Sequence, residues 1–394
     1  MSAEIPKKIA NAYYAYGILY LSENFRRWEA SQGSRYQAYR RAWVRRPADL
    51  EHGEFPLNLN IEVTTRCNLA CTFCSHPSLK EEQKFDMPWD LYARLLEEGK
   101  RYNTPAANLN GLGEPMLRPD LPRMIRAAKE HGFLDVMFHT NGTLMTERQA
   151  QALIESGLDR IIFSVDSPDK STYEAMRVRG KWEQTVANVR CFHEIRTRMN
   201  KTLPLIRTTM VVTDKTVHQV PDFTHLWKPV ADQITLQDLT WRTKLLEKGS
   251  WENQEKSAIP VAMDQIRQEA KERKLSFVCP YLYQSADLYG NGDVIPCCNP
   301  NARKSMVMGR YDQKGIRGVW LGKRYQEIRK LHAEGRWDEH PICRECEVPL
   351  IELYKNLRES SETKSGSVAS QMSPNDGTAE DMVIRCQKEI EQAP

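Results

Sequence analysis

The feature that most constrains the fold is a regular alternation of short apolar runs with helical stretches between residues 56 and 240. Such an alternation is typical of a parallel sheet whose crossover connections are helices. Because six apolar runs occur, the sequence predicts an α/β fold built on an open, partial (β/α)6 barrel of TIM-like type. The predicted strands are 57–63, 107–110, 135–139, 160–165, 205–212 and 233–239, and the predicted helices between them are 88–102, 119–131, 146–156, 183–199 and 217–228.

The ten cysteines are unevenly spread. Seven fall into two groups, whereas Cys191, Cys298 and Cys386 stand apart. The chain opens without the pattern of a secretion signal and contains no apolar run of about 20 residues, so we expect a cytoplasmic protein. In a large cytoplasmic chain, clustered thiols more often bind metal or carry out redox chemistry than form disulfides.

The first 50 residues differ in charge from the rest of the chain. They hold nine Lys and Arg against four Asp and Glu, whereas the net charge of the whole chain is only +4. The remainder is near neutral, and we expect no nucleic-acid partner. Residues 5–46 read as helix. This element is expected to pack on the core, and the alternative is contact with an anionic membrane surface or an acidic partner.

These patterns predict four parts. Residues 1–50 form a basic helical extension, residues 51–245 the catalytic core, and residues 246–356 a small cysteine-rich α+β domain. Helices at about 260–273 and 322–334 and a hairpin near Gly290–Gly292 are predicted in that third part. Residues 357–394 contain almost no large apolar side chain before Met382 and are predicted to be disordered.

A CxxxCxxC loop follows directly after the first predicted strand, with Cys67, Cys71 and Cys74. Loops after the carboxyl ends of parallel strands form the active site in barrels of this kind. Thiolates at these spacings can wrap one face of an iron–sulfur cube and leave one iron open. The alternative is a zinc site with His76 as the fourth ligand.

The loop resembles that of the radical S-adenosylmethionine (SAM) superfamily, including the aromatic Phe73 before the third cysteine. Gly111-Leu112-Gly113-Glu114-Pro115 after the second strand is similar to the family's glycine-glycine-glutamate-proline motif, which implies that Glu114 receives the amino group of SAM. By the same resemblance, Asn141, Ser164 and Asp166 after the third and fourth strands lie near the carboxylate and ribose. The implied cofactor-binding residues are Phe73, Gly111, Gly113, Glu114, Pro115, Asn141, Ser164 and Asp166.

The second group of cysteines lies in the predicted C-terminal domain and comprises Cys279, Cys297, Cys343 and Cys346. Four thiolates are enough to enclose a cluster or a zinc ion. The arrangement resembles the SPASM/twitch auxiliary-cluster extension of the same superfamily. Since no cysteine follows Cys346 before the tail, the resemblance implies the shorter twitch type, and therefore two [4Fe–4S] clusters in all. Cys298 could replace Cys297 as a ligand, be a structural thiol, or act as a hydrogen-atom donor.

The resemblance implies that the cofactor is cleaved reductively to a 5′-deoxyadenosyl radical, which abstracts a hydrogen atom from the substrate. An external flavodoxin-like or ferredoxin-like donor would supply the electron. A fully ligated auxiliary cluster can accept an electron, so the first expectation is oxidation of a small sugar or aminocyclitol. The alternatives are epimerisation with Cys298 or Cys191 as hydrogen donor, peptide modification, and a non-enzymatic zinc-binding interaction protein.

Overall fold

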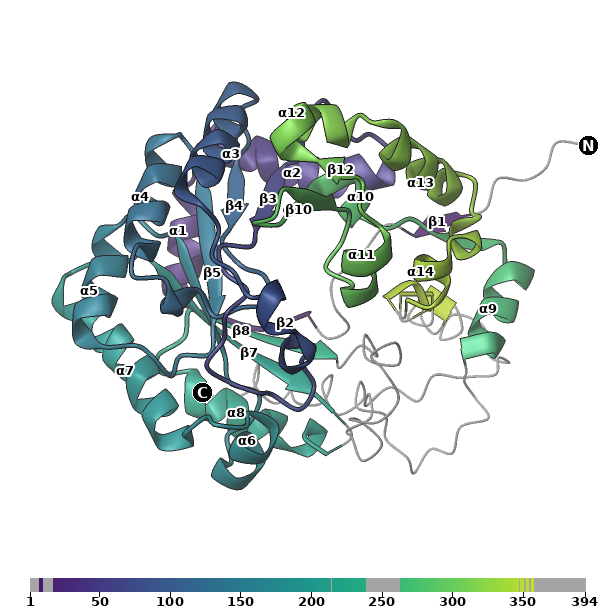
Figure 1. Cartoon of the computed structure of the whole chain (residues 1–394). Coiled ribbons are helices and arrows are strands. Elements are labelled where there is room, and N and C mark those ends of the chain that lie inside the picture. Colours follow the sequence, from purple (N-terminus) through teal and green to yellow (C-terminus); the bar gives the residue numbers. More distant parts are fainter. Residues whose placement is uncertain are drawn as a thin grey trace, which may run out of the picture.

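The computed structural model describes residues 7–9, 17–213, 215–238, 263–346, 348–350, 352–353 and 356–357. Six parallel strands form its centre in the order β3-β4-β5-β6-β7-β8, which confirms the predicted partial barrel (Figure 1). Each observed strand overlaps its predicted run. The strands are β3 (Asn58–Ile61), β4 (Ala106–Asn108), β5 (Asp135–Thr140), β6 (Arg160–Ser164), β7 (Leu205–Val212) and β8 (Gln233–Asp238).

Helices cover the outer face of this sheet (Figure 1). Successive residues of a strand point to opposite faces, and alternate side chains such as Ile61, Phe138 and Ile161 join the main hydrophobic core with the helices. A capping box of Thr146 and Gln149 fixes the start of α5. The core helices are α3 (Trp89–Arg101), α4 (Leu121–Glu130), α5 (Glu147–Glu155), α6 (Lys170–Met176), α7 (Trp182–Arg198) and α8 (Val220–Trp227), with 3-10 turns at His76–Ser78, Glu81–Gln83, Pro115–Leu117 and Val217–Gln219.

The N-terminal segment corrects one prediction. Residues 5–46 are not helical throughout, because β2 (Gly17–Leu21) pairs antiparallel with the outer edge of β8 and β1 (Lys7–Ile9) pairs with β9 (Leu275–Phe277). An unpaired sheet edge offers backbone hydrogen bonds that a helix cannot use, and aromatic and β-branched residues favour a strand. The helical prediction holds for α1 (Glu23–Ala30) and α2 (Ser34–Ala48).

Helices α1 and α2 pack where the barrel strands begin. Trp28 and Tyr36 join a buried cluster with Leu57, Ala106 and Leu205, which precede or open three different strands. This confirms that the extension packs on the core. Two of its arginines are engaged within the chain: Arg46 donates to the carbonyl oxygens of residues 52 and 55, and Arg45 lies 2.7 Å from a carboxylate oxygen of residue 51.

The C-terminal segment continues the same sheet. Strand β10 (Ser285–Leu288) pairs parallel with β3, and β11 (Asp293–Ile295) and β12 (Gly309–Arg310) extend the sheet to ten strands. The predicted hairpin is therefore present. The helices of this segment are α9 (Met263–Glu272), α10 (Tyr281–Gln284), α11 (Pro300–Ser305), α12 (Tyr311–Trp320), α13 (Lys323–Ala333) and α14 (Pro341–Arg344), with a 3-10 turn at Trp337–Glu339.

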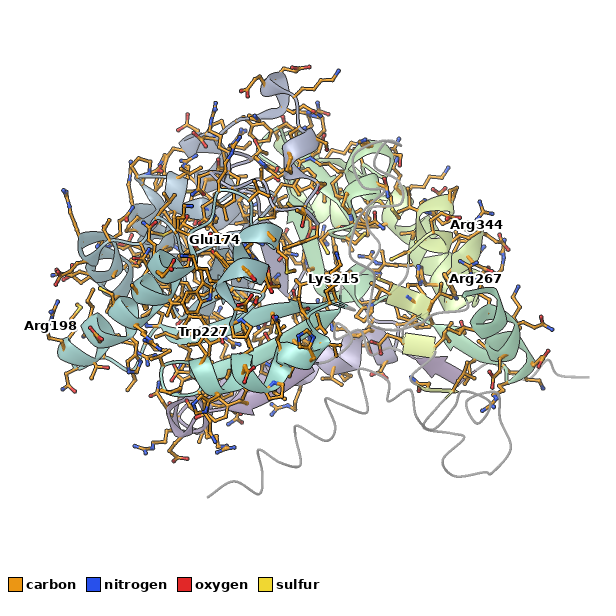
Figure 2. The ribbon with its side chains drawn as sticks, turned by 90° about the horizontal axis from the view of Figure 1, so that it is seen from below. Glu174, Arg198, Lys215, Trp227, Arg267 and Arg344 are labelled. Atoms are coloured by element: carbon orange, nitrogen blue, oxygen red, sulfur yellow. The ribbon has the colours of Figure 1, made fainter. Side chains whose placement is uncertain are left out.

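Helix α9 docks beside the second cysteine group. Arg267 Nη2 donates to the carbonyl oxygen of Arg344 at 2.6 Å, and the two arginines lie next to each other in Figure 2. Among the described residues, no helix has both the length and the apolarity that a membrane crossing needs. The tail predicted to be disordered, residues 357–394, lies outside the described residues except for residue 357.

Candidate functional site

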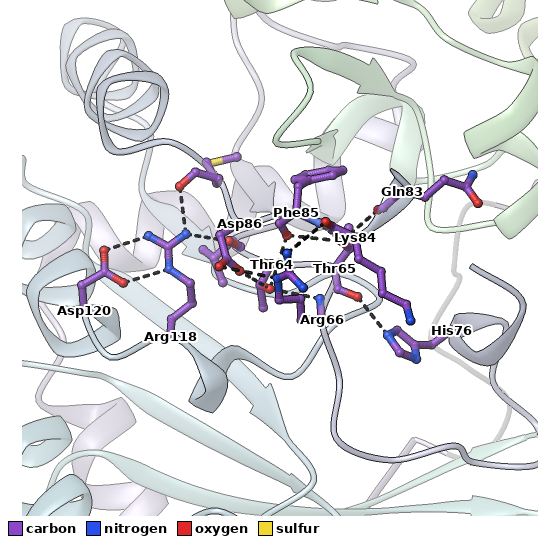
Figure 3. Close-up of polar contacts among 12 residues, drawn as sticks. Thr64, Thr65, Arg66, His76, Gln83, Lys84, Phe85, Asp86, Arg118 and Asp120 are labelled. Carbon is purple, nitrogen blue, oxygen red and sulfur yellow. Dashed lines mark hydrogen bonds and ion pairs between the residues drawn. The ribbon is translucent and has the colours of Figure 1, made fainter. Parts of the chain in front are cut away.

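The backbone that leads into the first cysteine loop is held by a network of polar contacts (Figure 3). The Thr64 hydroxyl donates to Asp86 Oδ1 at 2.6 Å. Arg118 Nη1 donates to the carbonyl oxygen of Val63 at 3.2 Å, while its Nε and Nη2 donate to the two carboxylate oxygens of Asp120 at 2.8 and 2.7 Å. Arg118 thus connects the residue after β3 with Asp120, which follows β4. The cysteine loop therefore starts from a fixed position.

The three thiols of the loop lie within electrostatic reach of one another. Burial, together with the neighbouring Cys74 and Cys67 thiolates, raises the pKa of Cys71 to about 12. Burial likewise raises the pKa of Cys67 to about 11, with Glu114 and Cys74 adding to the shift. These thiols are therefore protonated at neutral pH without a metal, and binding a cluster would release their protons.

A buried arginine that sequence reasoning missed faces these thiols. Arg177 Nη1 lies 4.0 Å from Cys71 Sγ, and its guanidinium carbon lies 5.7 Å from the centre of the Phe73 ring. Its Nε donates to Asp166 Oδ2 at 2.7 Å. The guanidinium lowers the pKa of Cys67, Cys71 and the third thiol of the loop against the effect of burial. It is the one described cation that acts on all three, and it stabilises thiolate charge there.

Asp166 is fully buried and both of its oxygens are engaged. Oδ2 accepts from Arg177, and Oδ1 accepts from the backbone N–H of Val211 at 2.9 Å. Its φ of 59° places it in the left-handed region. The structure therefore shows Asp166 joining the β6 loop, the β7 strand and the arginine. The predicted ribose contact of Asp166 stays a prediction.

The glycines of the second motif are required by close packing on the first loop. A Cβ on Gly113 would lie 2.3 Å from the carbonyl oxygen of Thr64, and one on Gly111 would lie 2.4 Å from Glu62 Cγ. The backbone N–H of Glu114 donates to the carbonyl oxygen of Arg66 at 2.7 Å. The motif therefore sits directly against the residues that precede the first cysteine.

Glu114 joins the motif to the loop after β5. Its buried carboxylate accepts from the Asn141 N–H (2.7 Å), the Thr140 hydroxyl (2.8 Å) and the Met116 N–H (3.0 Å). Burial raises the pKa of Glu114, whereas these three donors and Arg177 lower it. The carboxylate is thus held in one orientation, as a group that binds an ammonium must be.

The remaining predicted cofactor residues lie on the same loops. Asn141 Nδ2 donates to Asn68 Oδ1 at 2.9 Å, and Asn68 in turn donates to the Thr143 hydroxyl at 2.8 Å. This chain of amides connects the cysteine loop with the loop after β5. Pro115 opens the 3-10 turn after the motif, and Ser164 ends β6 level with Thr209 of β7. Contact of these residues with SAM stays a prediction.

The second cysteine group also converges. Burial, together with the neighbouring Cys346 and Cys298 thiolates, raises the pKa of Cys279 to about 12. Burial raises the pKa of Cys297 well above its usual value, as do Cys298, Cys279 and Cys346. Cys343 is shifted in the same direction by burial, Cys279 and Cys346. Five thiols thus gather here, and whether residue 297 or 298 is the ligand stays open.

The two other thiols weighed as hydrogen donors are placed differently. Cys298 is partly exposed, and its Sγ donates to Tyr281 Oη at 3.8 Å. Cys191 lies on α7, which covers the outer face of the sheet. Burial raises the pKa of Cys191, and Glu147 of the neighbouring α5 adds to the shift. Cys191 is therefore on the wrong side of the sheet to reach a substrate inside the barrel.

Zinc was the alternative for both cysteine groups. Among the described residues, no three or more His, Cys, Asp or Glu side chains lie close enough together to hold a single metal ion. The Nε2 of His76 lies 2.9 Å from the carbonyl oxygen of Thr65, whereas its Nδ1 is buried and has no hydrogen-bond partner among the described residues. In a cubane cluster each thiolate binds a different iron, so the sulfurs lie further apart than around one zinc ion. Convergent thiols, the arginine and the glycine cradle fit the cluster and its cofactor.

The inner face of the barrel is polar, which is unusual for a packed barrel interior. Asn60 Nδ2 donates to Asp287 Oδ1 at 2.6 Å, and Asn60 Oδ1 accepts from the amides of Asn58 (2.7 Å) and Asn108 (3.4 Å). The side-chain oxygens of Asn58 and Asn108 are buried and accept no hydrogen bond from a described residue. The described surface also has a hollow of about 520 Å³ between α3 and α12, but no predicted site residue lines it.

The strand ends of this partial barrel bring together three thiols, a glycine-rich turn and a buried glutamate. This combination is expected of iron–sulfur enzymes that bind SAM. The sequence profile of the radical SAM superfamily matches residues 61–223, and that of the SPASM iron–sulfur cluster-binding domain matches residues 279–347. The chain belongs to the radical SAM superfamily and carries a C-terminal SPASM-type domain. Its cofactors are SAM and iron–sulfur clusters.

The individual relatives match this chain over less than half of its length. A "Probable GTP 3',8-cyclase" of Methanococcus maripaludis is 29% identical over 164 residues, which cover 42% of this chain and 52% of the relative. An "AdoMet-dependent heme synthase" of Nitratidesulfovibrio vulgaris is 34% identical over 145 residues, 36% of this chain and 39% of the relative. The chain thus spans about half the length of the curated relatives it matches, or less.

Solved structures support the fold alone at the identities found. Streptococcus suis SuiB bound to S-adenosylmethionine is 17% identical, with a TM-score of 0.57 over 81% of this chain and 78% of that one. The protein anSMEcpe with bound AdoMet is also 17% identical, with a TM-score of 0.55 over 83% of this chain and 98% of that one. Both likenesses support the overall fold of this chain.

Proposed function

We propose that this enzyme oxidises a small polyhydroxylated substrate bound at the inner face of its barrel. The observation that carries the proposal is the row of amides and a carboxylate formed by Asn58, Asn60, Asn108 and Asp287. Barrel interiors without a ligand are packed with branched apolar side chains, whereas hydroxyl groups need donors and acceptors of this kind. Two amide oxygens of this row are buried and have no partner among the described residues, so their capacity to accept a hydrogen bond is unused.

The cysteine groups are proposed to hold two [4Fe–4S] clusters, one on Cys67, Cys71 and Cys74 and one on the four cysteines of the C-terminal segment. With SAM bound, these cofactors supply a carbon-centred radical and an electron acceptor. Dehydrogenation of an alcohol then removes one hydrogen atom, one proton and one electron from the substrate. The protein's part is to hold the carbon next to the radical source and to keep water out.

The residues of the site have separate tasks in this scheme. Glu114, held by three donors, is proposed to orient the ammonium group of SAM. Arg177 keeps a positive charge against the first thiolates. The amide row orients the hydroxyls of the substrate below the strand ends. An external flavodoxin-like or ferredoxin-like protein is proposed as the electron donor for the first cluster.

The test begins with anaerobically purified protein, its iron and sulfide content, and SAM-dependent formation of 5′-deoxyadenosine. Wild type should contain about twice the iron of a Cys67/Cys71/Cys74→Ala variant, and only wild type should form deoxyadenosine. A panel of sugars and aminocyclitols deuterated at carbon should then transfer deuterium into deoxyadenosine and give a ketone. Zinc without iron, or deuterium transfer with no oxidised product, would contradict the proposal.

Epimerisation is the second candidate, because Cys298 presents a partly exposed thiol beside the second cysteine group. An epimerase returns a hydrogen atom from a thiol whose proton exchanges with water. In D₂O its product carries deuterium, and Cys298→Ala abolishes that label. A dehydrogenase gives no such label. Peptide modification is tested in the same assay with peptides in place of sugars.

A further inference from the structure

The inner face of the barrel contains an arginine that the proposed scheme has not used. Arg207 lies on β7, where it pairs with Ile162 of β6 and Gln233 of β8, and Ile162 pairs with His139 of β5. Residues 206, 210 and 212 of β7 point outward into the main core, so Arg207 points inward. It lies two residues before Thr209, which is level with the end of β6.

The charges around Arg207 do not balance. Asp135 is the nearby carboxylate, but Arg160 has already taken it: Arg160 Nε lies 2.9 Å from Asp135 Oδ1, and Arg160 Nη2 donates to Asp135 Oδ2 at 2.9 Å. Arg160 Nη2 also donates to Tyr36 Oη at 2.9 Å, so this guanidinium has a second partner at the lower end of the barrel. The buried Asp135 carboxylate is therefore paired with Arg160, and Arg207 makes no ion pair with a described residue.

Arg207 has no acceptor within the part of the chain that the structure describes. Its Nε is buried and makes no hydrogen bond. Burial and the neighbouring Arg160 lower the pKa of Arg207 to about 10, so the guanidinium is still charged at neutral pH. The Arg207 side chain is half-buried. An arginine cannot escape the cost of partial burial by losing its proton, and charges removed from water in proteins are usually paired or bind a ligand.

The groups beside Arg207 fit an anionic ligand. Burial and the nearby Arg207 lower the pKa of His139 to about 3, so the imidazole is neutral at neutral pH. A neutral imidazole donates one hydrogen bond without adding a second positive charge. The amides of Asn58 and Asn108 lie on the same inner face. A planar guanidinium with free donors matches the two oxygens of a carboxylate or phosphate.

We infer that Arg207 binds an anionic oxygen group of the substrate, either a carboxylate or a phosphate, so that the substrate is an anionic polyhydroxylated molecule. This inference rests on the proposed function and narrows its substrate class. The carboxylate of SAM itself is a poorer occupant, because Arg207 lies within β7 and below the row of Ser164 and Thr209, whereas the cysteine and glycine loops lie beyond the strand ends.

The test compares three probes of one size, namely glucose, glucuronate and glucose 6-phosphate, by calorimetric titration into the anaerobic holoenzyme with SAM present. Wild type should bind at least one anionic probe at least about tenfold more tightly than glucose, and the preferred probe tells a carboxylate from a phosphate. Arg207→Met should weaken binding of that probe by about 10- to 150-fold, the range for a lost charged hydrogen bond. Arg207→Lys should keep part of the affinity for phosphate but less for carboxylate, because lysine lacks the planar fork.

A second measurement separates ligand binding from a structural role. If Arg207 is unpaired in the free enzyme, Arg207→Met should raise the melting temperature without ligand and abolish stabilisation by inorganic phosphate. The affinity for SAM should stay unchanged. A lower melting temperature in Arg207→Met, a weaker SAM affinity, or equal binding of all three probes would overturn the inference. Anion binding that depends on Arg207, with no probe oxidised, would instead refute only the proposed oxidation.

Discussion

The ion pair between Glu62 and Arg303 joins the two halves of the chain and makes a quantitative prediction. Arg303 Nη1 and Nη2 donate to Glu62 Oε1 and Oε2 at 2.6 and 2.8 Å, and the Glu62 and Arg303 side chains are only 1% and 17% exposed. Glu62 Oε1 also accepts from the N–H of Leu112 in the glycine motif at 3.2 Å. Arg303 lies 4.2 Å above the ring of Tyr289, on α11 just after Cys297.

Arg303→Met leaves the Glu62 carboxylate buried without its cation. Removal of one partner of a buried pair costs about 3–5 kcal/mol. If that cost loosens the contact between α11 and the glycine motif, backbone amides there should exchange roughly two to three and a half orders of magnitude faster, at about 1.4 kcal/mol per tenfold. Native-state hydrogen exchange with mass spectrometry on peptides that contain Leu112 and α11 measures this change.

The double variant Glu62→Gln/Arg303→Met tests the origin of the effect. It removes both charges, so it should exchange more slowly than Arg303→Met alone, with a coupling energy of about 1–3 kcal/mol. Arg310→Met is the matched control, because Arg310 is 40% exposed and its pair with Asp312 should contribute at most about 1 kcal/mol. Equal exchange in Arg303→Met and Arg310→Met, or strictly additive single effects, would refute the reasoning.

Three further predictions concern the cofactor loops and the inner face. Gly113→Ala places a Cβ 2.3 Å from a backbone oxygen and should weaken SAM binding in calorimetry, whereas Gly33→Ala, with open space around it, should not. Asp166→Asn/Arg177→Met removes a buried cation beside the first thiolates and should lower the reduction potential of that cluster in an EPR-monitored titration, with the auxiliary cluster unchanged. His139 has a pKa of about 3 in the folded chain and about 6.5 unfolded, so the unfolded state binds the proton first and stability falls as pH drops below 6.5. Between pH 7 and pH 5 the loss should be about 2 kcal/mol, and His139→Asn should remove that part of the pH dependence.

The fold of the core could be predicted because its signals are local. Each strand and helix of the barrel carries its own periodicity, and the predicted elements overlap the observed ones from Asn58 to Asp238. The segment 17–21 could not be predicted in the same way. Its strand exists because the edge of β8 lies beside it, and that edge is more than 200 residues away in the sequence. Local propensity cannot report a partner at that distance.

The site shows the same division. The cysteine spacings and the glycine motif are short patterns, and the structure brings Cys67, Cys71, Gly113 and Glu114 together. Arg177 was missed because it belongs to no motif and stands 106 residues from the thiol that it faces. Only a buried acid such as Asp166 directly after a strand hinted that a cation was needed nearby. Pairs of this kind are fixed by the tertiary fold.

The course of the sheet bears on the proposed position of the substrate relative to the two cysteine groups. The first cysteine loop follows the end of β3, whereas β11 runs antiparallel to β10 and returns the chain toward the edge where β3 begins, where Cys297 follows it. The two cysteine groups therefore follow strands that run in opposite directions, and a strand of four residues such as β3 spans about 13 Å. Asn60 and Asp287 pair between those ends. A substrate held there would lie between the proposed radical source and the proposed electron acceptor. An oxidation needs both of them, whereas an epimerisation needs no electron acceptor.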